Sequence, residues 1–288
     1  MLTISKLRKI FCQKKFYPKK KLGQSFLIDG NIQKKILQSC ELSRDDTILE
    51  IGAGLGQLTE DLTRKVKKAY AVEKDKVLSQ WLRENLGSFK NLEIIERDIL
   101  EFPLPFKTSP LNLKFKVIGN LPYYIATPIL TRLIEDRRTI DSIYVTLQKE
   151  LAQRIIAAPG GKEYSAFTVF VNYYTCPKIL FPIKRTCFYP QPEVDSCFMK
   201  LEVLSNPRVK VKSEELFFYT VRSTFQKRRK TLLNSLAKGR LNLSKKTLLN
   251  ILEEAQIEPQ SRPEILSIMD FARLTQTIDR HIAHNGLL

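Results

Sequence analysis

Short apolar runs alternate with helix-length amphipathic segments along the first 200 residues of this chain. The runs are rich in β-branched residues and lie at 47–52, 69–73, 93–98, 115–120 and 142–148. This alternation is typical of a mostly parallel sheet covered by helices. Two more runs, 178–183 and 194–203, have no helix-length segment between them and predict a hairpin that closes the sheet.

The pattern becomes helical after residue 211. Ser213 is followed by two acids, a favourable helix start, and Ser261 begins a second start with the spacing of a capping box. Residues 204–211 have the character of a linker. We therefore expect a basic N-terminal arm (1–20), an α/β domain (21–205) and a small all-helical domain (206–288).

Composition narrows the range of functions. The chain has 288 residues, 43% of them hydrophobic, which is typical of a folded globular protein. No apolar stretch approaches the length of a membrane span. Five scattered cysteines indicate reduced thiols in an intracellular, cytoplasmic protein. The two histidines, His281 and His284, lack acidic or cysteine companions, so we expect neither a metal nor a serine–histidine–aspartate site.

The formal net charge of +18 suggests a polyanionic partner, either nucleic acid or an anionic membrane surface. Residues 1–21 carry eight Lys or Arg and no acid, and residues 227–230 read Lys-Arg-Arg-Lys. Each run alone is compatible with a solvated surface, and the first also with an organelle presequence. Together, the two clusters favour a binding surface.

Polar or glycine residues end four successive predicted strands. Gly52, Gly54 and Gly56 follow the first, Glu73 ends the second, Asp98 the third and Asn120 the fourth. The glycine spacing is one residue shorter than a dinucleotide fingerprint, and a simple turn is the alternative. Because open α/β sheets bind ligands at the carboxyl ends of their strands, these residues predict a ligand site.

Asn120-Leu121-Pro122-Tyr123 adds chemistry to that site. An amide and an aromatic ring are suited to hold a flat heterocycle and to accept hydrogen bonds from its exocyclic amine. The alternative is a plain strand-to-loop turn, since Asn and Pro favour turns.

Several segments together resemble one known family, the ribosomal RNA adenine dimethyltransferases of the KsgA type. The resemblance covers roughly residues 20–274. Its segments are 21–27, 50–56, 120–123, 164–165, 188–196 and 225–236. Many members carry Asn at the place of Ser25, and a backbone contact there survives this exchange.

The resemblance implies a fold, a cofactor and a set of site residues. The fold is a Rossmann-like class I methyltransferase sheet with a C-terminal helical domain, and the cofactor is S-adenosylmethionine. The implied cofactor-binding residues are Gln24, Ser25, Leu27, Gly52, Gly54, Glu73, Asp98 and Asn120. The implied catalytic residues are Asn120, Leu121, Tyr123 and Phe188, with the two rings stacking on the target adenine.

The implied substrate is an adenine loop near the 3′ end of 16S rRNA in the small ribosomal subunit, bound by a monomer. Phosphate contacts are expected from Lys20, Lys21, Arg222, Lys227, Arg228, Arg229 and Lys230. Three alternatives stay open: a large-subunit rRNA methyltransferase of the antibiotic-resistance type, a nicotinamide dehydrogenase, and a non-catalytic RNA-binding assembly or transcription factor.

Overall fold

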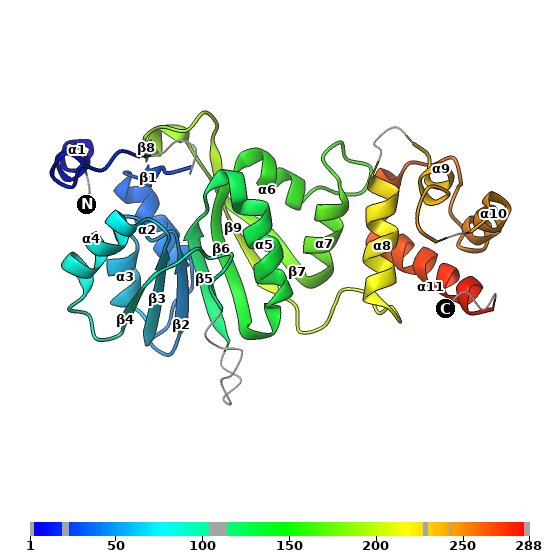
Figure 1. The fold of residues 1–288 in the computed structure, drawn as a ribbon, viewed down its shortest axis with the longest axis horizontal. Coiled ribbons are helices and arrows are strands. Elements are labelled where there is room, and N and C mark those ends of the chain that lie inside the picture. The colour runs from blue at the N-terminus through cyan, green and yellow to red at the C-terminus, as the bar shows by residue number, and fades with distance from the viewer. Residues whose placement is uncertain (1–2, 19–22, 104–113, 227–229, 242, 285–288) are drawn as a thin grey trace. The chain divides into compact units, whose positions relative to one another are not determined.

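A computed structural model describes residues 3–18, 23–103, 114–226, 230–241 and 243–284 (Figure 1). Contacts divide the chain into two compact units. The first comprises Met1–Ala152 and Cys176–Val203, and the second comprises Gln153–Thr175 and Leu204–Leu288. The division differs from the expected one, because residues 153–175 join the helical unit and the N-terminal segment belongs to the first unit.

A seven-stranded mixed sheet forms the centre of the first unit, in the order β4-β3-β2-β5-β6-β9-β7. Strands β4, β3, β2, β5 and β6 run parallel to one another, and β9 pairs antiparallel with β6. The expected α/β sheet is therefore present. The strands are β2 (Thr47–Ile51), β3 (Lys68–Glu73), β4 (Leu92–Glu96), β5 (Phe115–Asn120), β6 (Ile140–Gln148), β7 (Thr175–Ile183) and β9 (Ser196–Val203).

Helices accompany the strands of the first unit (Figure 1). They are α1 (Ile4–Gln13), α2 (Gly30–Ser39), α3 (Thr59–Thr63), α4 (Lys76–Leu86), α5 (Ala126–Glu135) and α6 (Lys149–Ile155), which crosses into the second unit. Aspartates start two of them: the side chains of Asp29 and Asp75 accept hydrogen bonds from the first backbone N–H groups of α2 and α4. Helix α4 packs against β3 and β4.

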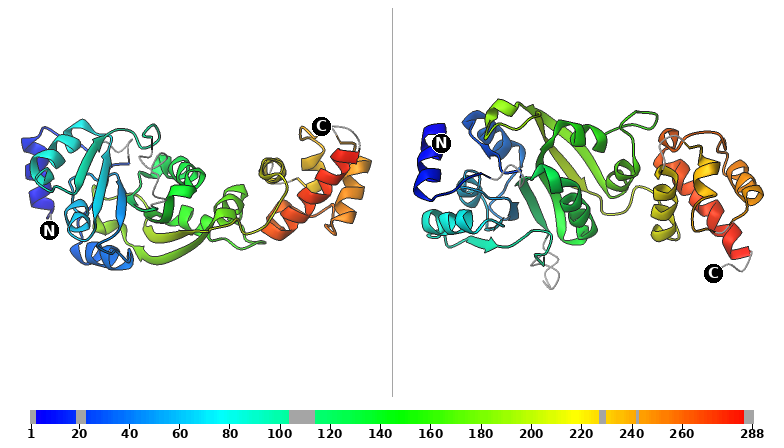
Figure 2. Two further views of the ribbon diagram at one scale, coloured as in Figure 1. Left: turned by 90° about the horizontal axis from the view of Figure 1, so that it is seen from below. Right: turned by 45° about the horizontal axis from the view of Figure 1, so that its top comes forward.

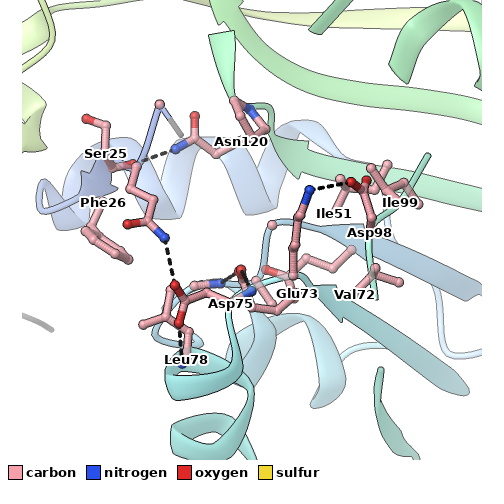
Figure 3. A pocket seen from close by; sticks show the side chains of 18 of the residues that line it. Ser25, Phe26, Ile51, Val72, Glu73, Asp75, Leu78, Asp98, Ile99 and Asn120 are labelled. Carbon is pink, nitrogen blue, oxygen red and sulfur yellow. Dashed lines mark hydrogen bonds and ion pairs between the residues drawn. The ribbon is translucent and has the colours of Figure 1, made fainter. Parts of the chain in front are cut away.

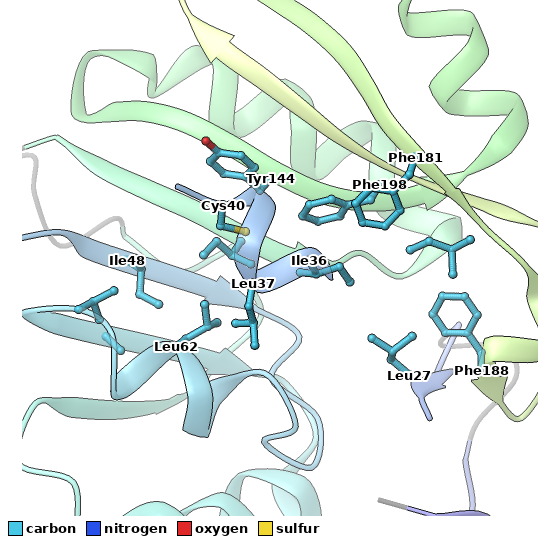
Figure 4. Close-up of a cluster of buried hydrophobic side chains, with 14 residues drawn as sticks. Leu27, Ile36, Leu37, Cys40, Ile48, Leu62, Tyr144, Phe181, Phe188 and Phe198 are labelled. Carbon is cyan, nitrogen blue, oxygen red and sulfur yellow. The ribbon is translucent and has the colours of Figure 1, made fainter. Parts of the chain in front are cut away.

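A cluster of buried apolar side chains fills the space between α2, α3 and the sheet (Figure 4). Ile36 and Leu62 come from the helices, and Ile48, Tyr144 and Phe198 come from the strands. Nearly continuous burial along β2, β6 and β9, which lie inside the sheet, places these side chains in the core.

A separate two-stranded ribbon joins distant parts of the sequence. Strand β1 (Phe26–Leu27) pairs antiparallel with β8 (Phe188–Tyr189). The ribbon brings together residues from two of the segments that carry the family resemblance, since Phe26 lies opposite Tyr189 and Leu27 opposite Phe188.

Helices make up most of the second unit. They are α7 (Ala166–Tyr174), α8 (Glu214–Phe225), α9 (Leu232–Leu236), α10 (Lys245–Glu254) and α11 (Ile268–His284). The yellow-to-red helices α8 to α11 pack on one another in every view (Figures 1 and 2). Rings from α7 and α8 form an aromatic cluster, with the Tyr173 and Phe217 centroids 4.8 Å apart.

The sequence predicts a third helix start, with Thr127 as N-cap and Pro128 at the first helical position. Of the three expected helix starts, two are wrong and one is right. Ser213 caps α8 as expected. Helix α5 begins at Ala126, one residue before Thr127, because a 3-10 turn (Tyr123–Ile125) already leads into it. Ser261 precedes only a 3-10 turn, whereas Ser267 exchanges hydrogen bonds with Asp270 at the start of α11.

Within the described part of the chain, no helix combines the length and apolar content needed to cross a bilayer. The same residues contain no group of three or more His, Cys, Asp and Glu side chains that could hold a metal ion.

Candidate functional site

A cavity of about 570 Å³ opens at the carboxyl ends of β2, β3, β4 and β5 (Figure 3). All of the residues expected to bind a cofactor line it. These are Gln24, Ser25, Leu27, Gly52, Gly54, Glu73, Asp98 and Asn120. Parallel strands end at the same edge of the sheet, so residues far apart in sequence meet there.

The glycine loop after β2 forms the floor of the cavity. Gly52, Gly54 and Gly56 have φ values of +72°, +58° and +81°, a conformation that favours glycine over residues with a Cβ. The Gly54 N–H donates to Glu73 Oε2 at 2.9 Å, which ties the loop to the end of β3. The glycines therefore serve backbone conformation, and the loop is held by a buried carboxylate.

Two buried carboxyl groups lie beneath this loop. Burial raises the pKa of Glu50 to about 8, and the nearby Glu73 carboxyl adds to the rise. Burial also raises the pKa of Glu73, which is 8% exposed. Its Oε1 accepts a second backbone hydrogen bond, from the Asp75 N–H. Such groups favour a ligand that carries positive charge or hydrogen-bond donors, since either would offset the cost of ionisation.

Asp98 lies at the far wall of the cavity and is engaged on both oxygens. Lys74 Nζ donates to Asp98 Oδ2 at 2.6 Å (Figure 3). The Leu100 N–H donates to Oδ1 at 2.9 Å. Partial burial alone would raise the pKa of Asp98, but the hydrogen bonds from Lys74 and the Leu100 N–H and the positive charges of Lys74 and Arg132 together outweigh it and lower that pKa. The carboxylate is therefore ionised and ready to accept further donors.

The side-chain amide of Asn120 has a hydrogen-bond partner on its nitrogen but, in the described structure, none on its oxygen. Its Nδ2 donates to the Ser25 carbonyl oxygen at 2.9 Å (Figure 3). Because a carbonyl only accepts, the amide presents its nitrogen to Ser25 and its oxygen to the other side. Oδ1 is buried and has no hydrogen-bond partner in the described structure. A buried acceptor without a donor is costly, so this atom marks the place for a ligand N–H.

Tyr123 and Leu121 are held at the same strand end but do not line the cavity. The Tyr123 hydroxyl lies 2.7 Å from Ser196 Oγ, and burial raises the pKa of Tyr123. The Leu121 side chain is buried, and its N–H donates to the Thr146 carbonyl at 3.2 Å. These contacts anchor the tetrapeptide to β6 and β9, and the expected roles of both residues toward a base stay predictions.

The Phe188 side chain does not line the cavity, although the resemblance implies that it stacks on the target adenine. Its side chain is 3% exposed and packs in the hydrophobic core beside Leu27, outside the residues that line the cavity (Figure 4). Strand pairing explains this position, because β8 is fixed against β1 and the ring alternates inward. In this arrangement the ring offers no free face to a base, so its stacking role stays a prediction.

Several lining residues were not expected from the sequence. Lys15, Phe16 and Tyr17 come from the segment assigned to a basic arm, and Tyr124 directly follows the tetrapeptide. Apolar residues at positions 4, 7 and 11 have helical spacing and were the available signal for an ordered segment before Lys15. Tyr17 and Tyr124 are 81% and 51% exposed and form part of the cavity rim.

The residues expected to contact RNA are only partly described. Arg222 on α8 and Lys230 before α9 are exposed in the second unit. Lys20, Lys21, Lys227, Arg228 and Arg229 lie outside the described residues.

The residues of this cavity fit a methyl donor such as S-adenosylmethionine. The glycine loop leaves space for a ligand backbone, the Glu73 and Asp98 carboxyls can accept hydrogen bonds from hydroxyl and amine groups, and the buried carboxyls suit a cation. The unmatched Asn120 oxygen lies on the same cavity wall as Ser25.

Comparison with known proteins agrees with this geometry. The family model described as "Ribosomal RNA adenine dimethylase" matches residues 15–274. A protein of Clostridium botulinum (strain Loch Maree / Type A3), named "Ribosomal RNA small subunit methyltransferase A", is 43% identical over 260 residues, 90% of this chain and 93% of its own. A protein of Moorella thermoacetica with the same name is 40% identical over 273 residues, 92% of this chain and 94% of its own.

Two solved structures share the fold over most of the chain. A dimethyladenosine transferase from Plasmodium falciparum has a TM-score of 0.72 and 27% identity, and the match covers 91% of this chain and 98% of that protein. The 23S rRNA methyltransferase ErmE has a TM-score of 0.68 and 25% identity, with 88% and 99% covered. The sheet and its C-terminal helices therefore have the class I methyltransferase fold.

Proposed function

This chain belongs to the ribosomal RNA adenine dimethylase family, and from that premise we propose that it dimethylates the exocyclic amine of adenine in small-subunit rRNA. The chain is accordingly a methyltransferase, and we infer S-adenosylmethionine as its methyl donor. The observation that carries the proposal is the buried Asn120 oxygen without a partner, at the strand end that borders the cavity.

Asn120 and the residues around it have different roles in the proposed reaction. S-adenosylmethionine, when bound, supplies a methyl group on a sulfonium that is already an activated leaving group. Asn120 Oδ1 accepts one amine hydrogen and the Leu121 carbonyl accepts the other, which localises the nitrogen lone pair for attack. Tyr123 holds the flipped base by stacking.

The geometry needs no general base before attack. The amine proton becomes acidic only after the nitrogen is alkylated, so orientation supplies most of the rate enhancement. The hydrogen bond from Asn120 Nδ2 to the Ser25 carbonyl prevents the amide from turning over, which would replace an acceptor with a donor.

The substrate is proposed in more detail from the sequence motifs. We infer two adjacent adenines near the 3′ end of 16S rRNA, presented by a folded loop in the subunit or its precursor, and a monomeric enzyme with a role in small-subunit biogenesis. The basic residues around 20–21 and 222–230 supply phosphate contacts that give affinity and little sequence information.

The large-subunit alternative is not favoured. A 23S rRNA methyltransferase shares the fold. This chain nevertheless carries Leu121 inside the tetrapeptide and the basic segment 225–236, both typical of the small-subunit enzymes.

The experiment supplies labelled S-adenosylmethionine and unmethylated small ribosomal subunits, then maps the modified bases. We expect label on adenine amines of 16S rRNA only. Label confined to large-subunit rRNA, or to protein, would contradict the proposal.

A further inference from the structure

The N-terminal helix α1 lies outside the part of the chain that the family model matches, which begins at residue 15. One face of the helix is nevertheless buried. Leu7 is 0% exposed and Phe11 8%, and both pack with Phe16, Phe26 and Leu55 in one apolar cluster. The helix is therefore docked on the first unit.

The cluster under α1 reaches the loops that form the cavity. The Phe11 ring centroid lies 5.5 Å from that of Phe26. A Cβ added to Gly54 would lie 3.2 Å from the Phe26 ring, so this ring packs directly on the glycine loop. Leu55 of the same loop and Leu78 of α4 complete the cluster. Displacement of Phe11 would therefore loosen the backbone that lines the cofactor cavity.

The segment that follows α1 enters the cavity itself. The helix ends at Gln13, and the next residue, Lys14, pairs with Glu84 of α4 at 2.5 Å. Lys15 then adopts a positive φ of 48°, and the Phe16 N–H returns to the Phe11 carbonyl at 2.8 Å. This tight reversal places residues 15–17 on the cavity wall.

Helix α1 also contacts the β8 segment. The Phe11 and Tyr189 rings are stacked at a centroid distance of 6.4 Å. Arg8 Nε donates to the Tyr189 hydroxyl at 3.4 Å, and its guanidinium carbon lies 5.8 Å from the centre of that ring. The next residue, Pro190, accepts a hydrogen bond from Ser25 Oγ at 2.7 Å. Ser25 in turn holds the Asn120 amide.

We propose that α1 and residues 15–17 are a positioning element of the methyl-transfer site, which supports the cofactor loop through Phe11 and the acceptor side through Arg8 and Tyr189. This inference rests on the proposed function. It predicts that the helix acts on cofactor affinity and on turnover, although none of its residues reacts.

The test uses full-length protein with Phe11→Ala, the conservative Phe11→Leu, and Gln13→Ala on the exposed face of α1 as the matched control. Binding of S-adenosylhomocysteine is measured by calorimetry, and kcat and KM are measured on unmethylated small subunits. We expect Phe11→Ala to raise the Kd for S-adenosylhomocysteine and the KM for S-adenosylmethionine about threefold to tenfold, while RNA affinity is unchanged. Phe11→Leu should restore most of the binding, and Gln13→Ala should match the unaltered protein.

A lower melting temperature with unchanged Kd and KM would overturn the inference, because α1 would then only stabilise the fold. If Phe11→Ala does not fold, Arg8→Ala carries the test, since its side chain is exposed. We expect that variant to lower kcat with an unchanged Kd for S-adenosylhomocysteine, and an unchanged kcat would overturn the inference. Absence of methyl transfer by the unaltered protein would instead count against the proposed function, while the calorimetric comparison would still test α1.

Discussion

At the scale of single residues, the nitrogen and the oxygen of the Asn120 amide have different roles. The nitrogen is committed to the Ser25 carbonyl, and the buried oxygen lacks a donor in the described structure. The sequence predicted an acceptor at this position because Asn120 ends a predicted strand. The direction of the amide depends on Ser25, which lies 95 residues away along the chain.

We expect Asn120→Ala to lower kcat by at least about 100-fold, the loss typical of removing one oriented hydrogen-bonding group at a reacting centre. RNA affinity should stay nearly intact, because phosphate contacts lie elsewhere. Filter binding and single-turnover transfer measure the two effects. Asn85→Ala, on the exposed face of α4, is the control. An equal loss of RNA binding would contradict the assignment.

Glu50 predicts a specific pH dependence of stability. Its pKa is raised from 4.5 to about 8 by burial, so the folded state retains a proton that the unfolded chain has lost between these values. The contribution of Glu50 to the free energy of unfolding therefore falls as pH rises through this window, at a rate approaching about 1.4 kcal/mol per pH unit for one proton.

Glu50→Gln should remove this slope. Thermal unfolding of the ligand-free protein, measured from pH 5 to pH 8.5, should show the variant gaining stability relative to the unaltered protein as pH rises. Glu73, whose pKa is also raised, stays in both proteins and largely cancels in the comparison. Parallel pH profiles would show that Glu50 does not titrate in this window.

At the scale of elements, the sequence predicted strands better than helix starts. The range 115–120 is a strand with the expected bounds, and the other expected strands are present with ends shifted by a few residues. Apolar periodicity identifies strands because it reflects burial on the sheet. Thr127 and Ser261 failed as caps because a neighbouring 3-10 turn satisfied the local backbone first.

Strand β5 must approach β2 closely at its carboxyl end, where Gly119 lies. A Cβ at this position would lie 2.8 Å from the Ile51 carbonyl oxygen and 3.2 Å from the Ile51 Cβ. Because the nearest atom is backbone, the strands would have to separate. We expect Gly119→Ala to lower the free energy of unfolding by about 1–3 kcal/mol.

Urea unfolding of Gly119→Ala measures this loss, with Lys114→Ala, exposed just before β5, as the control. The displacement of β5 should also alter the cofactor site, since Asn120, which lines the cavity, directly follows Gly119. An unchanged midpoint for Gly119→Ala would show that the two strands adjust without cost.

At the scale of the whole molecule, the main features are the positive net charge and the division of the chain into two compact units. The net charge of +18 is spread over two compact units, and the helical unit includes residues 153–175 as well as the C-terminal helices. The linker character of residues 204–211 was visible in the sequence. The assignment of α7 to the second unit was not, because its partners, the rings of α8, lie some 40 residues later.

Affinity for small-subunit RNA should fall steeply with salt. If about four phosphates are neutralised, raising monovalent salt from about 50 to about 200 mM should weaken binding roughly 100-fold. S-adenosylhomocysteine binding, which releases no such counterions, is the internal control and should change little. A flat salt profile for RNA would contradict a phosphate-contact surface.

The sequence by itself determined the α/β class, the four strand-end residues Gly52, Glu73, Asp98 and Asn120 of the cavity wall, and the basic character of the chain. Strand ends in a parallel sheet converge by topology, so their order along the chain was enough to bring these residues together. Only the tertiary structure decided the direction of the Asn120 amide, the burial of Phe188 and the docking of α1 beside the cavity. These depend on which distant surfaces meet, and local propensity does not contain that information.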